Sequence, residues 1–210
     1  MRYSIIIGKV GAGKTTAILS MARNLIHEKG LKVGIMYDEL GDVPLNNSVA
    51  DENGFKLSDR GSPCPCLSCN LGALVTSIKE LEEDIQPDVV LLEAGDAIVA
   101  TRLKEFAQTA MEFVDISYGP AFLFVDCSRI DKYVLGPLWL RTGNHVKEAD
   151  IVILNKVEGV PEDKLQAAEK KILDLNPEVE VIQLGKDDPE ILERMITTLL
   201  NQKEYHKVTV

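Results

Sequence analysis

The sequence predicts a doubly wound α/β fold with a mostly parallel sheet. Short apolar runs alternate along the 210 residues with longer amphipathic stretches, and several of these runs are apolar at consecutive positions. A glycine-rich segment also joins the first run to the first helical stretch. A strand that is apolar on both faces is typical of a parallel sheet that helices cover on both sides. We therefore expect a single domain over residues 1–210.

The individual elements follow from the same patterns. Prolines at positions 161 and 189 each suit the first position of a helix, where the missing N–H would have no partner. Residues 38–70 and 127–144 lack clear periodicity, and loops of this length are commonly functional or mobile. The expected strands are 3–7, 32–37, 89–92, 121–125, 151–154 and 179–182, and the expected helices are 15–28, 71–85, 97–113, 161–175 and 189–201.

Composition and charge narrow the classes of function. Asp and Glu number 33 against 23 Lys and Arg, so the formal net charge is −10 at pH 7. This charge repels polyanions and argues against broad binding to nucleic acid or to acidic membranes. The longest apolar runs are strand-sized, far short of the ~20 residues that cross a bilayer. The N-terminus shows no secretory signal pattern, so we expect a cytoplasmic protein in a reducing compartment.

A phosphate-binding loop follows the first expected strand. The segment GKVGAGKT satisfies the pattern GxxxxGK[ST], directly before a helical stretch. Its glycines let backbone N–H groups curl around phosphate oxygens, Lys14 adds a positive charge near the β and γ phosphates, and the Thr15 hydroxyl can ligate Mg²⁺. The residues expected to contact a nucleoside triphosphate here are Gly8, Lys9, Val10, Gly11, Ala12, Gly13, Lys14, Thr15 and Thr16.

Acidic residues follow two other expected strands. Glu93 follows the run 89–92 at the carboxyl end of a strand, where ligands of such sheets bind, and we expect it to hold Mg²⁺. Gly95 lets the backbone approach the γ phosphate because it has no side chain. Asp38 and Asp42 follow the second strand, and one of these acids is expected to orient the attacking water or to bind Mg²⁺. The spacing leaves that choice open. The candidate catalytic residues are Lys14, Asp38, Asp42 and Glu93, and the candidate magnesium ligands are Thr15, Asp38 and Glu93.

The segment NKVE at residues 155–158 indicates a base site. It follows a buried strand and resembles the guanine-recognition pattern NKxD, with Glu158 in place of aspartate. The acid of that pattern accepts hydrogen bonds from guanine N1 and N2, which adenine cannot offer, while Asn155 and Lys156 brace the loop and the ring. Glutamate keeps both oxygens and is one methylene longer. GTP is therefore the expected nucleotide, with ATP as the alternative, and residues 184–186 are placed to close over the base.

Three of the four cysteines crowd into six positions. Cys64, Cys66 and Cys69 lie too close together to staple distant parts of a fold. Their thiolates could share one soft or borderline cation such as Zn²⁺, Ni²⁺ or Cu⁺, with a fourth ligand from water, Cys127 or a second subunit. A redox thiol pair or an iron–sulfur cluster is the alternative. We expect an inserted cysteine loop at about residues 58–71, placed so that a metal could respond to the state of the nucleotide.

The order of these motifs resembles that of the SIMIBI-class metal-delivery GTPases, the family of the UreG, HypB and CobW proteins. GKVGAGKTT at 8–16 is similar to the P-loop of that family, and DELGD at 38–42 is similar to its switch segment. SPCPCLSCNL at 62–71 stands where CobW proteins carry a CxCC motif, and EAGD at 93–96 and NKVE complete the order. The resemblance implies a P-loop NTPase fold of SIMIBI type. It also implies GTP hydrolysis coupled to delivery of zinc or nickel to a client metalloenzyme or accessory protein, with a nucleotide-dependent homodimer.

The sequence also departs from that family. Its cysteines are spaced CxCxxC, EAGD lacks the longer ExxG spacing, and we expect a G domain alone, without a CobW-type C-terminal domain. Lys9 follows Gly8, as does the signature lysine of the deviant Walker A ATPases related to MinD and the nitrogenase iron protein, where it reaches across a dimer. Two alternatives therefore remain: an ATPase maturation factor that carries a metal or a cluster, and a nucleotide-gated binding module with negligible turnover.

Overall fold

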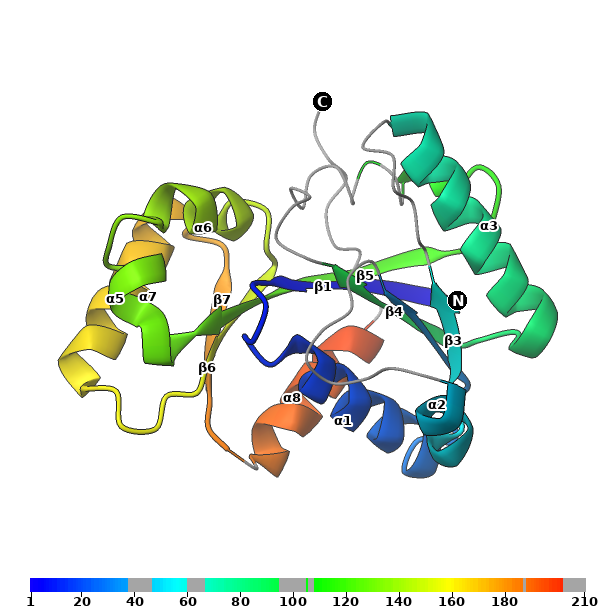
Figure 1. Cartoon of the computed structure of the whole chain (residues 1–210), viewed down its shortest axis with the longest axis horizontal. Coiled ribbons are helices and arrows are strands. Elements are labelled where there is room, and N and C mark those ends of the chain that lie inside the picture. The colour runs from blue at the N-terminus through cyan, green and yellow to red at the C-terminus, as the bar shows by residue number, and fades with distance from the viewer. Residues whose placement is uncertain (38–46, 60–66, 95–104, 106–107, 187, 202–210) are drawn as a thin grey trace.

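A seven-stranded parallel sheet forms the centre of the protein (Figure 1). The computed structural model describes residues 1–37, 47–59, 67–94, 105, 108–186 and 188–201, with the backbone alone at 47, 48, 59 and 67–71. The spatial order is β3-β2-β4-β1-β5-β6-β7, and every neighbouring pair is parallel, which confirms the predicted doubly wound α/β class. The strands are β1 (Arg2–Gly8), β2 (Val33–Tyr37), β3 (Lys56–Asp59), β4 (Val89–Ala94), β5 (Ser117–Asp126), β6 (Ile151–Asn155) and β7 (Glu180–Leu184).

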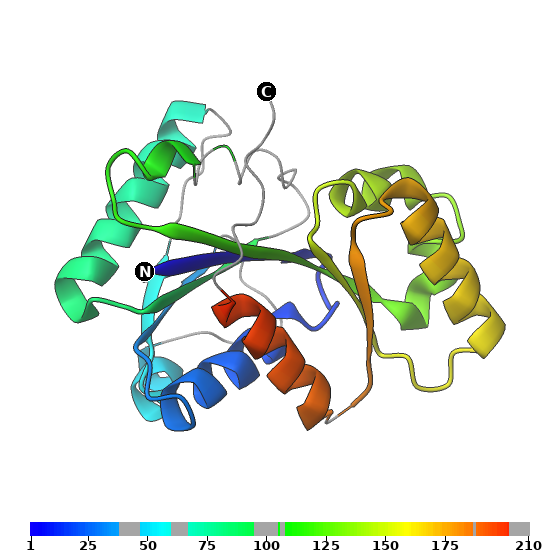
Figure 2. The same cartoon turned by 180° about the vertical axis from the view of Figure 1, so that it is seen from behind.

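Helices cover both faces of the sheet, as the view from behind also shows (Figure 2). One apolar core lies between the sheet and α1, α2 and α8, and a second lies between the sheet and α3, α5, α6 and α7. A short 3₁₀ turn, η1 (Cys127–Arg129), leads from β5 into α5. The helices are α1 (Lys14–His27), α2 (Asn47–Asn53), α3 (Leu67–Ile85), α5 (Ile130–Tyr133), α6 (Trp139–Val146), α7 (Glu162–Leu175) and α8 (Pro189–Leu200).

The central strand β1 shows why continuous apolar runs predicted this sheet. Ile5, Ile6 and Ile7 are all fully buried. Ile5 and Ile7 belong to the core under α3, whereas Ile6 belongs to the core under α1. Successive side chains of a strand point to opposite faces, so a strand covered on both faces needs an apolar residue at every position.

The two segments that lack periodicity contain structure that the sequence did not predict. The segment 38–70 includes α2, β3 and the start of α3, and the segment 127–144 includes η1, α5 and most of α6. The bounds expected for the cysteine loop, about 58–71, are too wide at both ends, because β3 continues to Asp59 and α3 already begins at Leu67. The predicted helix 97–113 lies mostly outside the described residues. Among the described helices, none is long and apolar enough to span a membrane.

The buried centre of β4 gives a test of this packing. Leu92 is fully buried, so Leu92→Ala should leave a cavity and lower the free energy of unfolding by about 2–5 kcal/mol. Leu140 on α6 is 80% exposed and supplies the control, since Leu140→Ala should change the stability by no more than about 0.5 kcal/mol. Denaturant titration followed by circular dichroism measures both variants. If both variants lost the same free energy of unfolding, the buried position of Leu92 would be contradicted.

Candidate nucleotide-binding site

The loop between β1 and α1 adopts a conformation that requires glycine at two positions. Gly8 has φ 151°, and a Cβ there would lie 2.5 Å from the carbonyl oxygen of Phe124. Gly13 has φ 97°, and a Cβ there would collide with the side-chain amide of Asn155. No side chain caps the start of α1 at Gly13. The N–H groups of the first helical turn are therefore directed at the loop, where an anion can bind.

Three of the predicted site residues meet below this loop. The Thr15 hydroxyl donates a hydrogen bond to Glu93 Oε1 at 2.7 Å, and the Lys14 Nζ lies 3.8 Å from the same oxygen. The Lys14 ammonium also donates to the carbonyl of Lys9 at 3.3 Å. Lys14, Thr15 and Glu93 are 6%, 7% and 2% exposed. The cluster forms because β4 lies beside β1 in a register that sets Glu93 against Ile6.

The chemistry of this cluster suits a magnesium–phosphate complex. A hydroxyl and a carboxylate are oxygen donors of the kind that Mg²⁺ prefers. The Lys14 ammonium supplies the positive charge that phosphate oxygens require. Because the group is almost completely buried, water screens these charges only weakly.

The NKVE segment lies directly against the glycine-rich loop. Asn155 Nδ2 donates to the carbonyl of Ala12 at 2.8 Å, and Lys156 Nζ donates to the carbonyl of Gly11 at 2.5 Å. Beside them opens a cavity of about 670 Å³, which is within the range of small-molecule sites. Its walls come from Gly13 and Thr16, the NKVE segment, residues 184–186 and the start of α8. The structure therefore joins the predicted phosphate and base sites into one continuous surface.

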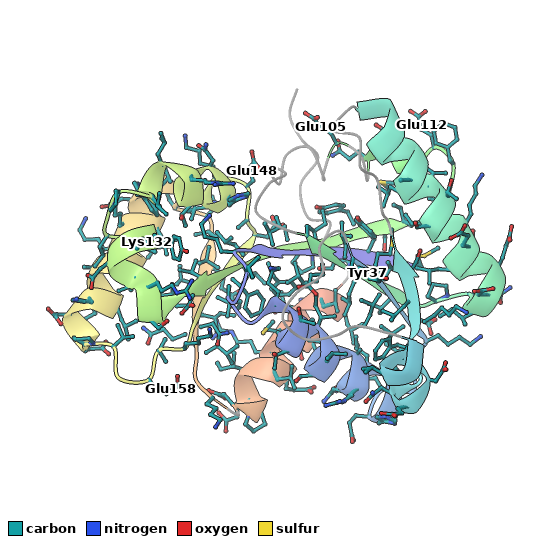
Figure 3. All side chains as sticks on the ribbon, in the orientation of Figure 1. Tyr37, Glu105, Glu112, Lys132, Glu148 and Glu158 are labelled. Atoms are coloured by element: carbon teal, nitrogen blue, oxygen red, sulfur yellow. The ribbon has the colours of Figure 1, made fainter. Side chains whose placement is uncertain are left out.

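Glu158 faces the loop that follows β7. Figure 3 shows it on the loop after β6, and its Oε1 accepts a hydrogen bond from the backbone N–H of Lys186. Backbone hydrogen bonds from Glu158 itself and from Lys186 lower the pKa of this exposed carboxyl. The acid is thus an anion at neutral pH, as an acceptor for guanine N–H groups must be.

Several predicted site residues lie outside the described part of the chain. These are Asp38, Asp42, Gly95, Cys64 and Cys66, while Cys69 is described only as backbone in the first turn of α3. Among the described side chains, no group of three or more His, Cys, Asp or Glu residues could hold a metal ion. The metal assignments to the cysteines therefore stay predictions.

Cys127 is poorly suited to be the fourth metal ligand that the sequence left open. It is 1% exposed, and its Sγ lies 3.8 Å from the carbonyl oxygen of Val125. Burial, and then the negative charge of Asp126, raise the pKa of this thiol to about 12. A metal ligand must be a thiolate, so Cys127 is better described as a core cysteine.

Two residues of the site region, Tyr133 and Asp126, were not predicted from the sequence. Tyr133 lies on α5, and its ring centroid is 5.3 Å from the ammonium of Lys9, which is next to the exposed Val10 in sequence. The neighbouring Lys132, labelled on α5 in Figure 3, lies 5.5 Å from the same ring. Asp126 at the end of β5 forms an ion pair with Lys156. The sequence contained a signal for Asp126, because it follows an expected strand in the same way as Glu93 and Asn155 do.

Comparison with known proteins places this architecture in a family. A family model described as the nucleotide-binding domain of CobW/HypB/UreG matches residues 2–183. The chain belongs to the CobW/HypB/UreG family. This confirms the family that the motif order indicated, and it explains why the P-loop, the strand-end acid and the NKVE segment occur in this order.

Individual relatives agree with this assignment. The chain is 29% identical to the urease accessory protein UreG of Metallosphaera sedula over 172 residues, which cover 74% of this chain and 72% of that protein. HypB from Helicobacter pylori, solved in complex with nickel, shares the fold with a TM-score of 0.64 at 18% identity, over 94% of this chain and 85% of that one. The Zn(II)-bound YjiA GTPase from E. coli gives a TM-score of 0.65 at 18% identity, over 98% of this chain and 63% of that one.

The buried position of Cys127 can be tested by thiol labelling. At pH 8 the native protein and Cys127→Ser should incorporate the same number of maleimide groups, because the Cys127 thiol is shielded and protonated. In denaturant the unsubstituted protein should incorporate one more. Mass spectrometry counts the labels. An extra label on the native unsubstituted protein would restore Cys127 as a candidate ligand.

Proposed function

We propose that this protein is a GTP-hydrolysing metallochaperone that binds a transition metal through Cys64, Cys66 and Cys69 and delivers it to a client metalloenzyme or accessory protein. The observation that carries the nucleotide half is the buried cluster of Lys14, Thr15 and Glu93 under the same glycine-rich loop whose Gly13 and Thr16 line the cavity at the NKVE segment. Family membership supports the delivery half, since relatives include a urease accessory protein and nickel-bound and zinc-bound structures.

Each part of the site has a proposed task. The glycine-rich loop, residues 8–16, holds the phosphates, and Lys14 neutralises charge on the β and γ groups. Thr15 and Glu93, together with Asp38, are the residues that would hold Mg²⁺, whose chemistry in such sites is to offset phosphate charge. Asp38 or Asp42 orients the attacking water, and the backbone at Gly95 approaches the γ phosphate. Asn155, Lys156 and Glu158 select and position guanine.

Helix α3 offers a physical route between the cysteines and the nucleotide. It begins at Leu67, so Cys69 lies in its first turn, and the strand that follows it, β4, carries Glu93 as its next-to-last residue. Leu74 and Ile78 of α3 share a core with Leu92 of β4. A shift of the cysteine segment can therefore reach the magnesium site through packed elements, and a nucleotide-dependent homodimer could supply further thiolates.

The base assignment predicts the effect of one substitution. Glu158→Ala should remove the preference for GTP over ATP, because guanine N1 and N2 lose their acceptor. The affinity for ATP should stay within about twofold of its starting value, a change below ~0.5 kcal/mol. Glu162→Ala, an exposed glutamate in the first turn of α7, is the control and should leave the preference intact. Calorimetric titration with both nucleotides measures this, and a protein that already prefers ATP would contradict the proposal.

The delivery mechanism predicts thermodynamic coupling between metal and nucleotide. A metal can respond to the nucleotide only if its affinity differs between the two nucleotide states. We expect Zn²⁺ or Ni²⁺ affinity to change about tenfold between GDP and a non-hydrolysable GTP analogue, which corresponds to about 1.4 kcal/mol of coupling. By linkage, added metal should change the ratio of nucleotide affinities by the same factor.

Two variants serve as the test and the control of that coupling. Serine at Cys64, Cys66 and Cys69 together should abolish metal binding and the coupling while nucleotide binding persists. Cys127→Ser should leave both unchanged, because that thiol is buried in the core. Equal metal affinity in both nucleotide states would reduce the cysteines to a static site and would rule out nucleotide-driven delivery.

A further inference from the structure

Asp126 is a buried carboxylate between the two halves of the candidate site. It is 4% exposed and ends β5, the strand that lies between β1 and β6. Its partner in the parallel register is Asn155, the first residue of NKVE. The position thus sets an acid beside both the glycine-rich loop and the base segment.

The two oxygens of Asp126 have different partners. Oδ1 accepts hydrogen bonds from the Ser128 backbone N–H at 3.1 Å and from the Ser128 hydroxyl at 2.6 Å, and so caps the turn η1. Oδ2 lies 3.3 Å from Lys156 Nζ and 3.8 Å from Arg129 Nε. The cap fixes the carboxyl orientation, and the second oxygen then presents negative charge to the NKVE segment.

Lys156 lies between this charge and the glycine-rich loop. Its backbone has φ 61°, a left-handed conformation that a non-glycine residue rarely adopts. Its side chain is 45% exposed, and its ammonium is shared between Asp126 Oδ2 and the Gly11 carbonyl. The residue also lines the cavity proposed for the base. An exposed lysine with only one carbonyl partner would sample many rotamers, whereas two partners define one.

We propose that Asp126 is a positioning residue for the nucleotide site, which acts by holding Lys156 across the glycine-rich loop at Gly11. The lysine so held forms a wall of the base cavity. This inference rests on the proposed function, because it assigns to Asp126 an effect on the binding of a nucleoside. It goes beyond that function by naming a strand-end acid that itself contributes no atom to the ligand.

The Asp126→Asn variant separates this role from capping. The amide retains the Oδ1 acceptor that caps η1 and loses the charge that holds Lys156. We expect GTP affinity to fall about threefold to fivefold, the scale of a partly exposed ion pair. Affinity for inorganic tripolyphosphate, which has no base, should change by less than about twofold. If Asp126 served only to cap η1, this substitution would change neither the affinity for GTP nor the affinity for tripolyphosphate.

A double-mutant cycle tests whether the effect passes through Lys156. Lys156→Met keeps the apolar stem and removes the ammonium, so adding Asp126→Asn in this background should produce no further loss of GTP affinity. Asp126→Glu retains the charge and should recover part of the affinity. Arg129→Gln removes the other cation and should leave GTP binding within about twofold. If Asp126→Asn fails to fold, Asp126→Glu and Arg129→Gln still carry the comparison.

The control and the contrary outcomes are distinct from those of the proposed function. The control is Asp150→Asn. The Asp150 carboxylate accepts a hydrogen bond from the Ala121 N–H at 2.8 Å and lies just before β6 begins, at the amino ends of the strands and away from the site. This substitution should leave GTP affinity unchanged. Additive losses in the cycle, or equal losses for GTP and tripolyphosphate, would overturn the inference while GTP binding itself stands. Failure of the unsubstituted protein to bind GTP would overturn both.

Discussion

The burial of opposite charges at the end of the central strands is the constraint on which this structure depends. A carboxylate that is 2% exposed costs several kcal/mol unless it is paired and hydrogen-bonded, and Glu93 has Thr15 and Lys14 as partners. Those partners are in place because β4 lies directly beside β1 in the sheet. The chain runs from β1 past β4 to β2 and later returns from β3 to β4, and right-handed crossovers in these two directions put α1 and α3 on opposite faces. The strand order and the site chemistry are therefore two aspects of one requirement.

The elements that could be predicted from the sequence are those whose burial requires a simple pattern of apolar residues. β1, β4 and β6 are apolar at consecutive positions because both faces of each strand are covered. The sequence NSVADEN of α2 and the four residues of β3 carry too little apolar periodicity for such reasoning. Short elements at an edge of the sheet are stabilised by tertiary contacts, and local sequence does not contain those contacts.

The candidate site divides in the same way. Gly13, Lys14, Thr15 and Asn155 could be predicted from motifs, because each motif position calls for a particular chemical feature: no Cβ at Gly13, an ammonium at Lys14, a hydroxyl at Thr15 and an amide at Asn155. Asp126 does not belong to any of these motifs, and its proposed role rests on its pairing with Asn155 on the neighbouring strand. Cys127 lies far from the other three cysteines in sequence, and its burial and raised pKa argue against a role as a metal ligand.

The contact between Lys9 and Tyr133 bears on the ATPase alternative. A lysine that reaches across a dimer would have to leave this ring, and a cation–π contact of about 0.5–2 kcal/mol is a small barrier to that movement. The contact therefore does not decide between the two classes. The decision falls to the base cavity, where donors and acceptors can be compared for guanine and adenine.

The hydrogen bond between Glu158 and Lys186 supports the proposed preference for guanine. It pairs an acceptor with a backbone donor in the lining of the cavity, and a base that displaces this bond must offer a new partner to each group. Guanine can do so, because N1 and N2 donate to a carboxylate while O6 accepts from an N–H. Adenine carries an amino donor at the position of guanine O6, and it leaves the carboxylate without its pair of donors. In the proposed exchange a bound base would release the loop after β7 from Glu158, and the free energy of guanine recognition would be reduced by the cost of breaking this hydrogen bond.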